Sequence, residues 1–332
     1  MSSNDSHHPE PSEQPDKRKA STRIVAKIFR ATVACLLLYL IFSQIGAMEI
    51  LRRAGSADIL ILLPAVALFI LVNYIASVRL KYLMDAQGLT LTAPVVFEIN
   101  LAARFYALFL PGGNLSALLI RVFRFAREGS QTERIVTALF ADRIIATWSL
   151  CFIGILFWMP AQSDWLWLFA FVAAFFACLI PIAAIFLNTW SFVPGWFTDL
   201  MRRLAPKYWS RLSDAVRRSR RSGLQTMNLS IVISLLAHLI GTAGYWLLAL
   251  SLGMELSLMA IGWIRAGMML ATLLPVSISG LGVREAASLV LLSYYNVPAD
   301  AAIAYSLIVF MTSILFIGLL GGLAEAWRFS RH

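Results

Sequence analysis

The sequence predicts an all-α polytopic membrane protein with about six full membrane spans and two re-entrant, broken-helix hairpins in two inverted repeats. Three observations lead to this prediction. Of the 332 residues, 59% are hydrophobic and 14% are charged, whereas a soluble domain is about half apolar and about a quarter charged. Apolar runs of about 20 residues, enough to cross a bilayer, recur along the chain. Two further apolar stretches are broken near their middles by proline and glycine.

Six apolar runs are long enough to cross a hydrocarbon core of about 30 Å. They cover residues 28–47, 59–78, 135–159, 165–187, 229–252 and 302–327. The first run is longer than the core of a signal peptide and lacks a small-residue cleavage site, so we expect it to be retained as a span. Residues 48–58 are expected to form a loop.

The rest of the chain is arranged around these spans. The first residues are polar and rich in Ser and Pro, which is typical of a disordered tail. The predicted parts are a cytoplasmic tail (1–27), a membrane domain (28–327) with halves at about 59–159 and 229–327 joined through a basic loop (188–228), and a cytoplasmic end (328–332).

The basic residues predict the orientation in the membrane. The chain carries 28 Lys and Arg and a net charge of +10. Most of them lie in blocks beside apolar segments: in the tail, after the second span (Arg79 and Lys81), and in the loop 188–228. Cytoplasmic loops of membrane proteins are rich in Lys and Arg. We therefore expect a multi-pass protein of the bacterial inner (plasma) membrane with both termini in the cytoplasm, and we expect no nucleic-acid partner.

The two broken stretches, 95–126 and 258–295, are predicted to be hairpins that enter the membrane and return to the same side. Unwound backbone at that depth is tolerated only where protein or a water-filled cavity satisfies it. Broken helices in corresponding places of two inverted halves indicate a transporter's midplane site; the alternative is two proline-kinked helices that are alike by chance. The predicted helix-break residues are Pro111, Gly112, Gly113, Pro275, Ser279, Gly280 and Gly282.

Five arginines lie in an apolar context and are the main candidates for binding. An Arg at the bilayer centre costs roughly 2.5–3.5 kcal/mol, so these side chains must pair, reach the headgroups or line a cavity. Guanidinium is suited to bidentate phosphate binding, and the half-helix after Gly282 would add its positive end. The predicted substrate-binding residues are Arg104, Arg121, Asp142, Arg143, Arg265, Arg284 and Glu285.

Buried ion pairs that tie the hairpins to the spans are the alternative interpretation of these arginines. Asp142 directly precedes Arg143, and Glu285 directly follows Arg284. The excess of Arg over acidic residues in these segments favours an anionic ligand over a proton or a metal cation. A lipid headgroup phosphate fits that description.

Catalysis and cofactors are not expected. His238 is the one histidine in an apolar run and has no acid near it in the sequence, so we expect it to pack between helices. The residues around Ser279 do not form a G-x-S-x-G turn. No His, Cys and Asp cluster has the spacing of a metal site, and no Walker-type motif is present. Intramembrane hydrolysis is the third and weakest of the functions considered.

Three segments of the second half resemble a known family. LLPVSISGLGVREAASLVLL, NVPADAAIAYSLIVF and GLLGGLAEAW are similar to the C-terminal signature of the lysylphosphatidylglycerol synthase transmembrane-region family, also called the flippase-like domain family. The ADR at 141–143, about 20 residues after a Pro-Gly break and Arg121, resembles that family's N-terminal half. The resemblance covers about residues 30–327.

The resemblance implies a function connected with lipids. It carries over Arg121, Asp142, Arg143, Pro275, Gly280, Gly282, Arg284 and Glu285. Leu118 and Leu119 stand where the family often has an acid, which argues against an acidic role there. The aminoacyl-transferring soluble domain has no counterpart here. The family thus implies lipid translocation, or a role beside lipid-linked glycan, hopanoid or aminoacyl-lipid synthesis, without the synthase reaction.

The predicted function is translocation of an anionic lipid or lipid-linked intermediate through an Arg-lined midplane cavity. In that scheme the Asp142–Arg143 and Arg284–Glu285 pairs break and re-form as the cavity changes sides. The alternative is a non-transporting scaffold or accessory subunit that recruits a cytoplasmic glycosyltransferase or lipid-modifying enzyme through the basic loop 188–228.

Overall fold

The computed structural model describes residues 47–109, 114–128, 132–161, 165–186, 223–273 and 282–329, together with Asp199, Asp214 and Arg217. Throughout these ranges the regular structure is helical and no strand is present, which confirms the all-α fold class. The helices are α2 (Ala47–Gly55), α3 (Ile59–Asp85), α4 (Ala93–Phe109), α5 (Asn114–Arg127), α6 (Thr132–Ala161), α7 (Trp165–Phe186), α10 (Gly223–Ser251), α11 (Leu258–Ala271), α12 (Val283–Ser293), α13 (Ala299–Phe310), the π-helix η2 (Met311–Leu315) and α14 (Phe316–Phe329).

Four helical segments of the described chain are long and apolar enough to cross a membrane: Ile59–Asp85, Thr132–Pro160, Leu224–Ser251 and Ala299–Arg328. They coincide with four of the predicted spans, so the protein is a multi-pass membrane protein. Helix α7 covers the predicted span at 165–187. The predicted first span at 28–47 lies outside the described residues, apart from Ala47.

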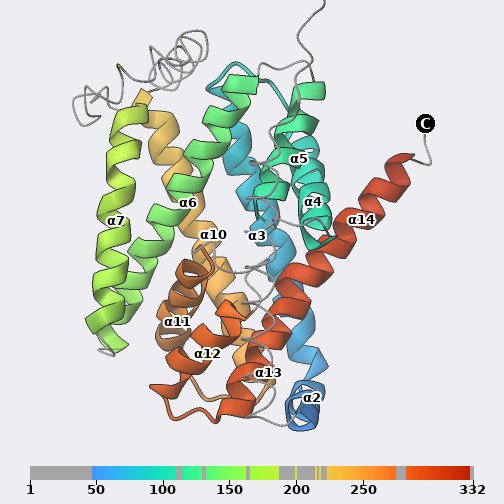
Figure 1. Cartoon of the computed structure of the whole chain (residues 1–332), viewed down its shortest axis with the longest axis vertical. Coiled ribbons are helices and arrows are strands. Elements are labelled where there is room, and N and C mark those ends of the chain that lie inside the picture. The colour runs from blue at the N-terminus through green and yellow to red at the C-terminus, as the bar shows by residue number, and fades with distance from the viewer. Residues whose placement is uncertain are drawn as a thin grey trace, which may run out of the picture.

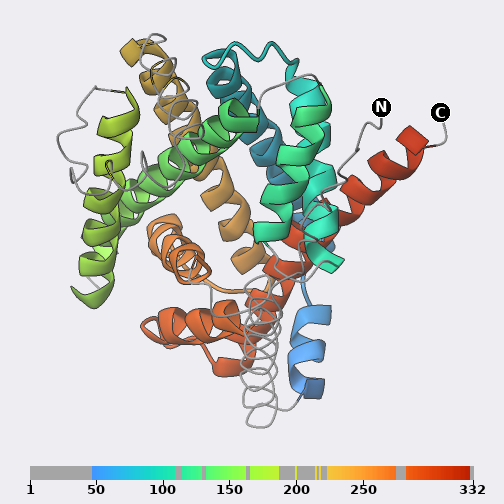
Figure 2. The same ribbon diagram turned by 45° about the horizontal axis from the view of Figure 1, so that its top comes forward.

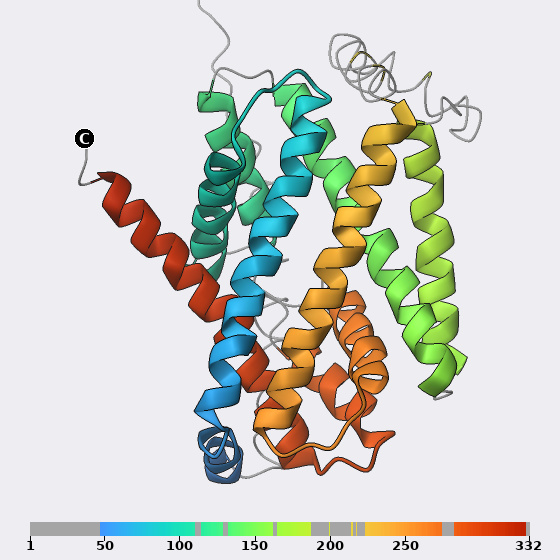
Figure 3. The ribbon, with the colours of Figure 1, turned by 180° about the vertical axis from the view of Figure 1, so that it is seen from behind.

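Helices α3 and α10 pack against each other along one face of the molecule. They lie side by side over most of their length and run in opposite directions (Figure 3). Helices α6 and α7 pack against each other beside this pair, and α6 also contacts α3, α10 and α11. A large buried cluster from α3, α6, α10, α11 and α13 holds these helices together, with Trp263 and Tyr305 among its largest fully buried side chains.

The two predicted hairpins are each a pair of helices that pack against each other, α4 with α5 and α11 with α12. The first pair lies toward the upper end of the molecule and the second toward the lower end (Figures 1 and 2). The breaks themselves, including the expected helix-break residues Pro111, Gly112, Gly113, Pro275, Ser279 and Gly280, lie outside the described residues. Gly282 is described and begins α12 at a φ of +82°, where a side chain would be strained.

The two ends of the molecule differ in charge. Helix α3 ends, α5 ends, and α4, α6 and α10 begin at the upper end in Figure 1. These helix ends carry basic residues: Lys81 near the end of α3, Arg124 and Arg127 in the last turn of α5, and Arg134 at the start of α6. The connections at the lower end, 252–257 and 294–298, contain no Lys or Arg. Arg52 and Arg53 of α2 lie near these connections, where Arg53 pairs with Asp300 at the start of α13.

Helix α2 corrects one expectation, because residues 48–58 were expected to form a loop and 47–55 are helical. The helix packs against α13. The Nε–H of Arg53 donates a hydrogen bond to Asp300 Oδ2 at 2.8 Å, which anchors α2 to the start of α13. Asp58 then begins α3, because its Oδ1 accepts a hydrogen bond from the backbone N–H of Leu60 at 2.8 Å.

Helix α3 corrects a second expectation. The sequence analysis placed Arg79 and Lys81 after the second span, but α3 continues to Asp85 and Arg79 is 5% exposed within it. The helix can extend because both charges are satisfied. Lys81 pairs with Asp85 one turn later, and Arg79 has polar partners on two other helices.

The predicted span at 302–327 is interrupted by the π-helix η2, which joins α13 to α14. Beyond this point α14 crosses α4 very closely. A Cβ on Gly321 would overlap the backbone carbonyl of Leu101, and one on Gly318 or Gly322 would meet the side chains of Leu108 or Phe105. The glycines are therefore what allows the two backbones to approach.

Ion pairs fix α14 to the first helix pair beyond this crossing. Glu325 is 5% exposed and pairs with Arg124 of α5. The Tyr106 hydroxyl of α4 donates a hydrogen bond to Glu325 Oε1 at 3.3 Å. Closer to the end of the helix, Arg328 Nη1 donates to Glu98 Oε1 at 3.4 Å. Helix α14 is thus tied to both α4 and α5 by polar contacts.

Candidate anion-binding cavity

A cavity of about 310 Å³ lies between the two helix pairs. Its described lining comes from α3, α4, α5, α6, α10, α11, α12 and η2. All five arginines that the sequence analysis placed in an apolar context line it: Arg104, Arg121, Arg143, Arg265 and Arg284. Among the lining residues that the structure describes, none is an Asp or Glu.

Three of the arginines form a first cluster, from the first half of the chain. Arg104 is on α4, Arg121 on α5 and Arg143 on α6, and the charges of Arg121 and Arg143 both repel Arg104. None of the three forms an ion pair with any residue that the structure describes. The Nε–H of Arg121 is buried and has no hydrogen-bond partner among the described residues. This cluster is a concentration of positive charge that has no ion-pair partner among the described residues.

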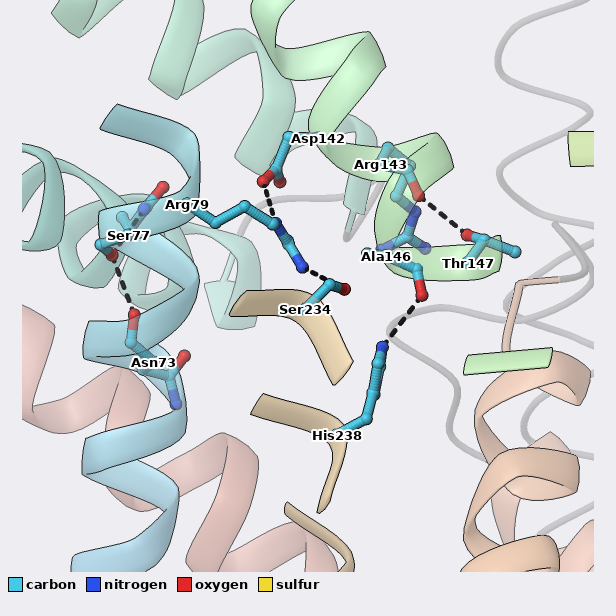
Figure 4. A network of polar contacts seen from close by, with 10 residues as sticks. Asn73, Ser77, Arg79, Asp142, Arg143, Ala146, Thr147, Ser234 and His238 are labelled. Carbon is cyan, nitrogen blue, oxygen red and sulfur yellow. Dashed lines mark hydrogen bonds and ion pairs between the residues drawn. The ribbon is translucent and has the colours of Figure 1, made fainter. Parts of the chain in front are cut away.

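Asp142 does not compensate the first cluster directly. The Nε–H of Arg79 donates to Asp142 Oδ1 at 2.7 Å, and Arg79 Nη1 donates to the Ser234 hydroxyl at 2.8 Å (Figure 4). The expected pair of Asp142 with its neighbour Arg143 is not formed, because the Asp142 carboxylate is engaged by Arg79 of α3. Asp142 still attracts Arg121 and Arg143 electrostatically.

Arg265 of α11 is held by uncharged partners. Its side chain is 3% exposed, and both terminal nitrogens lie 3.4 Å from His238 Nδ1. Its guanidinium carbon lies 5.2 Å from the centre of the Tyr245 ring, a cation–π distance. Gly241 leaves room for it, since a Cβ there would lie 2.7 Å from Arg265 Nη2. The Nε–H has no acceptor among the described residues.

His238 has a definite role in this arrangement. Its Nε2 lies 2.9 Å from the backbone carbonyl oxygen of Ala146 and can only donate to it (Figure 4). The other ring nitrogen of a neutral imidazole is then an acceptor, and it faces the Arg265 donors. His238 therefore positions Arg265 and is more than the packing residue that the sequence suggested.

We expect His238→Leu to destabilise the protein by about 1–3 kcal/mol, because it leaves buried donors of Arg265 without their acceptor. His238→Asn should cost less, since an amide oxygen can take the place of Nδ1 while the bond to Ala146 is lost. Melting temperatures of the purified protein in detergent would measure both. Equal melting temperatures for the Leu and Asn variants would contradict the positioning role.

Arg284 and Glu285 form a self-contained unit at the start of α12. Glu285 Oε2 accepts a hydrogen bond from the backbone N–H of Gly282 at 2.6 Å, which caps the helix. Glu285 Oε1 accepts from Arg284 Nη2 at 3.2 Å, so the expected pair of these neighbours is present. The Ser306 hydroxyl donates to the same oxygen at 3.3 Å. The charge of Arg284 is therefore largely offset before any ligand arrives.

The residues that sequence reasoning missed lie on α3 and on one face of α10. Ser234, His238, Gly241 and Tyr245 are spaced by four, three and four residues, and such residues share a face of a helix. That spacing was a signal for a polar face directed at a partner. Nothing in the sequence near Arg79 indicated that its partner would be Asp142, which is 63 residues away.

The described residues contain no group of three or more His, Cys, Asp or Glu side chains that could hold a metal ion. The polar groups that line the cavity are mainly hydrogen-bond donors, a set that suits an anion. Guanidinium donors come from five helices, and Asn73, Thr147, Thr272 and Ser313 add neutral polar groups.

Two comparisons with known proteins bear on this chain. The family model described as "Lysylphosphatidylglycerol synthase TM region" matches residues 27–321, which include every described residue that lines the cavity. A search of curated proteins found no match.

Proposed function

Because this chain belongs to the lysylphosphatidylglycerol synthase TM region family, and thus to membrane proteins of lipid-related processes, we propose that it moves an anionic lipid or lipid-linked intermediate between membrane leaflets. The observation that carries the proposal is the cavity that all five apolar-context arginines share. A guanidinium can hold two oxygens of a phosphate at once.

The burial of the arginines supports a ligand more than a purely structural role. Arg265 and Arg284 are each 3% exposed, and each has an Nε–H without an acceptor among the described residues. A buried donor that lacks an acceptor costs free energy. A bound phosphate would supply acceptors to both, whereas buried ion pairs alone, the alternative interpretation, account only for Arg284.

The arrangement of the helix pairs supports access from both sides. One pair lies toward the basic end and the other toward the opposite end, and the cavity lies between them. In the proposed scheme the two pairs are re-entrant hairpins of two inverted repeats, the basic end and both termini face the cytoplasm, and the membrane is the bacterial inner membrane. A headgroup would enter from one end and leave at the other while its acyl chains remain in the lipid.

Catalysis is not part of the proposal. Both ring nitrogens of His238 are engaged, by Ala146 and by Arg265, so this side chain is not free to act as a base. We propose no metal and no cofactor either. The scaffold alternative depends on the basic loop 188–228, most of which lies outside the described residues.

Exchange of fluorescent phosphatidylglycerol between leaflets of liposomes that contain the purified protein tests the proposal. We expect Arg121→Ala and Arg284→Ala each to slow exchange by about tenfold or more, since a charged hydrogen bond contributes about 1.5–3 kcal/mol. Arg284→Lys should also impair exchange, because Lys keeps the charge but loses the bidentate geometry.

Arg127→Ala is the matched control. Arg127 is exposed on the same helix as Arg121, and it is not among the lining residues. The control should exchange lipid like the wild type. The proposal fails if the cavity variants exchange lipid at the wild-type rate, or if the wild type exchanges no anionic lipid. In the second case, pull-downs with the basic loop would test the scaffold.

A further inference from the structure

The distribution of charge around the cavity restricts the class of ligand. Of the five lining arginines, Arg284 is offset by Glu285. Arg104, Arg121, Arg143 and Arg265 have no ion-pair partner among the described residues, and Asp142 is already engaged by Arg79. Four positive charges that have no ion-pair partner among the described residues therefore line one cavity of about 310 Å³.

These charges are unevenly placed. Arg104, Arg121 and Arg143 are close enough to repel one another, whereas Arg265 interacts mainly with Tyr245 and Tyr305 and with His238. A ligand with a single negative charge would leave at least two members of the first cluster uncompensated. Like charges that share one cavity repel one another, so such a ligand would leave much of the repulsion in place.

We propose that the cavity is selective for headgroups with two or more negative charges, namely phosphate monoesters and diphosphates, over phosphodiesters, which carry one. A phosphate monoester carries about −1.5 to −2 at pH 7. The first cluster binds the multiply charged group, and Arg265 with Arg284 forms a weaker second position toward the other end. This inference rests on the proposed function, because it specifies the ligand of the same cavity.

The geometry of the first cluster fits such a group. Its guanidiniums come from three different helices, so they approach from different directions and can each hold different oxygens. The unpartnered Nε–H of Arg121 adds a donor of fixed position. A phosphodiester has two oxygens free for such contacts, whereas a monoester has three and a diphosphate has more.

Equilibrium binding to the full chain in neutral detergent tests the selectivity. The lipid probes are dioctanoyl phosphatidic acid, a monoester, and dioctanoyl phosphatidylglycerol, a diester with the same acyl chains. The soluble probes are inorganic pyrophosphate and sulfate. We expect phosphatidic acid to bind about tenfold or more tightly than phosphatidylglycerol, the change expected from one added charged hydrogen bond.

Two variants with the same loss of charge complete the experiment. Arg104→Gln should reduce the ratio of the two lipid affinities toward one, and Arg127→Gln, outside the cavity lining, should leave the ratio unchanged. Arg104→Lys keeps the charge and should retain most of the preference, which guards against a variant that merely misfolds. A ratio near one in the wild type, or an unchanged ratio in Arg104→Gln, overturns the inference.

The soluble probes distinguish the source of the charged group. Binding of phosphatidic acid that exceeds binding of pyrophosphate supports selectivity for a lipid headgroup. Tight binding of pyrophosphate with weak binding of both lipids supports the selectivity for multiply charged groups and assigns the site to a free anion. If all four probes bind alike, the selectivity is refuted.

Leaflet exchange of the same lipids, measured in parallel, separates this inference from the proposed function. Exchange of phosphatidylglycerol without any preference for the monoester leaves the translocase intact and refutes the selectivity. Preferential binding without exchange of either lipid supports the selectivity and refutes translocation.

Discussion

Gly321→Ala is expected to destabilise the protein more than any other single methyl addition at the glycines discussed above. The added Cβ would overlap the backbone carbonyl of Leu101 on α4, and backbone cannot move aside as a side chain can. Overpacking typically costs about 1–3 kcal/mol, and we expect a value at or above the top of that range. A melting curve of the purified protein in detergent measures the effect.

Two other glycines provide graded controls for this prediction. A Cβ on Gly322 would meet only the ring of Phe105, which can shift, so Gly322→Ala should cost less. A Cβ on Gly55 would have no heavy atom within 4 Å, so Gly55→Ala should leave the melting temperature nearly unchanged. A melting temperature for Gly321→Ala that equals that of Gly55→Ala would show that α14 does not cross α4 as described.

Asp142→Asn is the second change with a large expected effect. It removes the negative charge that compensates Arg79, a side chain that is 5% exposed. Breaking a buried ion pair by removing one partner costs about 3–5 kcal/mol, because the other charge stays buried and uncompensated. We expect a clear fall in melting temperature, and in yield if the variant is expressed near its limit of stability.

A double variant separates the pair from its parts. Arg79→Met combined with Asp142→Asn removes both charges, and replacing a buried ion pair by uncharged residues is often close to neutral. The double variant should therefore recover most of the stability that Asp142→Asn loses. If the double variant instead loses as much stability as Arg79→Met alone and Asp142→Asn alone lose together, then Asp142 and Arg79 do not act as a pair.

Hydropathy and length predicted most of the fold. Long helices such as α6 and α10 each contain an apolar stretch long enough to cross a membrane, and in lipid the backbone must satisfy its own hydrogen bonds, so these segments were expected to be helices. The proline and glycine residues near the middle of the two remaining apolar stretches predicted a break in each stretch, and therefore two pairs of short helices. Helix α2 was missed because nine residues are too few for periodicity to decide, and because Asp300, its partner, is distant in the sequence.

The sequence predicted which residues form the candidate site, but it did not predict all of the ion pairs that they form. The cost of burying Arg identified the five cavity arginines without any structural information. Sequence adjacency correctly predicted the Arg284–Glu285 pair, because Glu285 also caps the helix that Arg284 begins. Adjacency failed for Asp142, because the packing of α3 on α6 brings Arg79 to it, and that packing cannot be read from local spacing.

The π-helix has a consequence for how this chain can vary in length. A π-turn holds one residue more than an α-turn over the same rotation of the helix, so deleting one residue from 311–315 would restore a regular α-helix with α14 facing nearly the same way. Deleting one residue from α13 would instead rotate α14 by about 100°. Gly321 would then no longer face Leu101, and Glu325 would turn away from Arg124. Ser313, in the cavity wall, lies in this same turn. The π-turn is thus a place where the chain can lose one residue without undocking α14, whereas the length of α13 has to stay fixed for α14 to keep its contacts with α4 and α5.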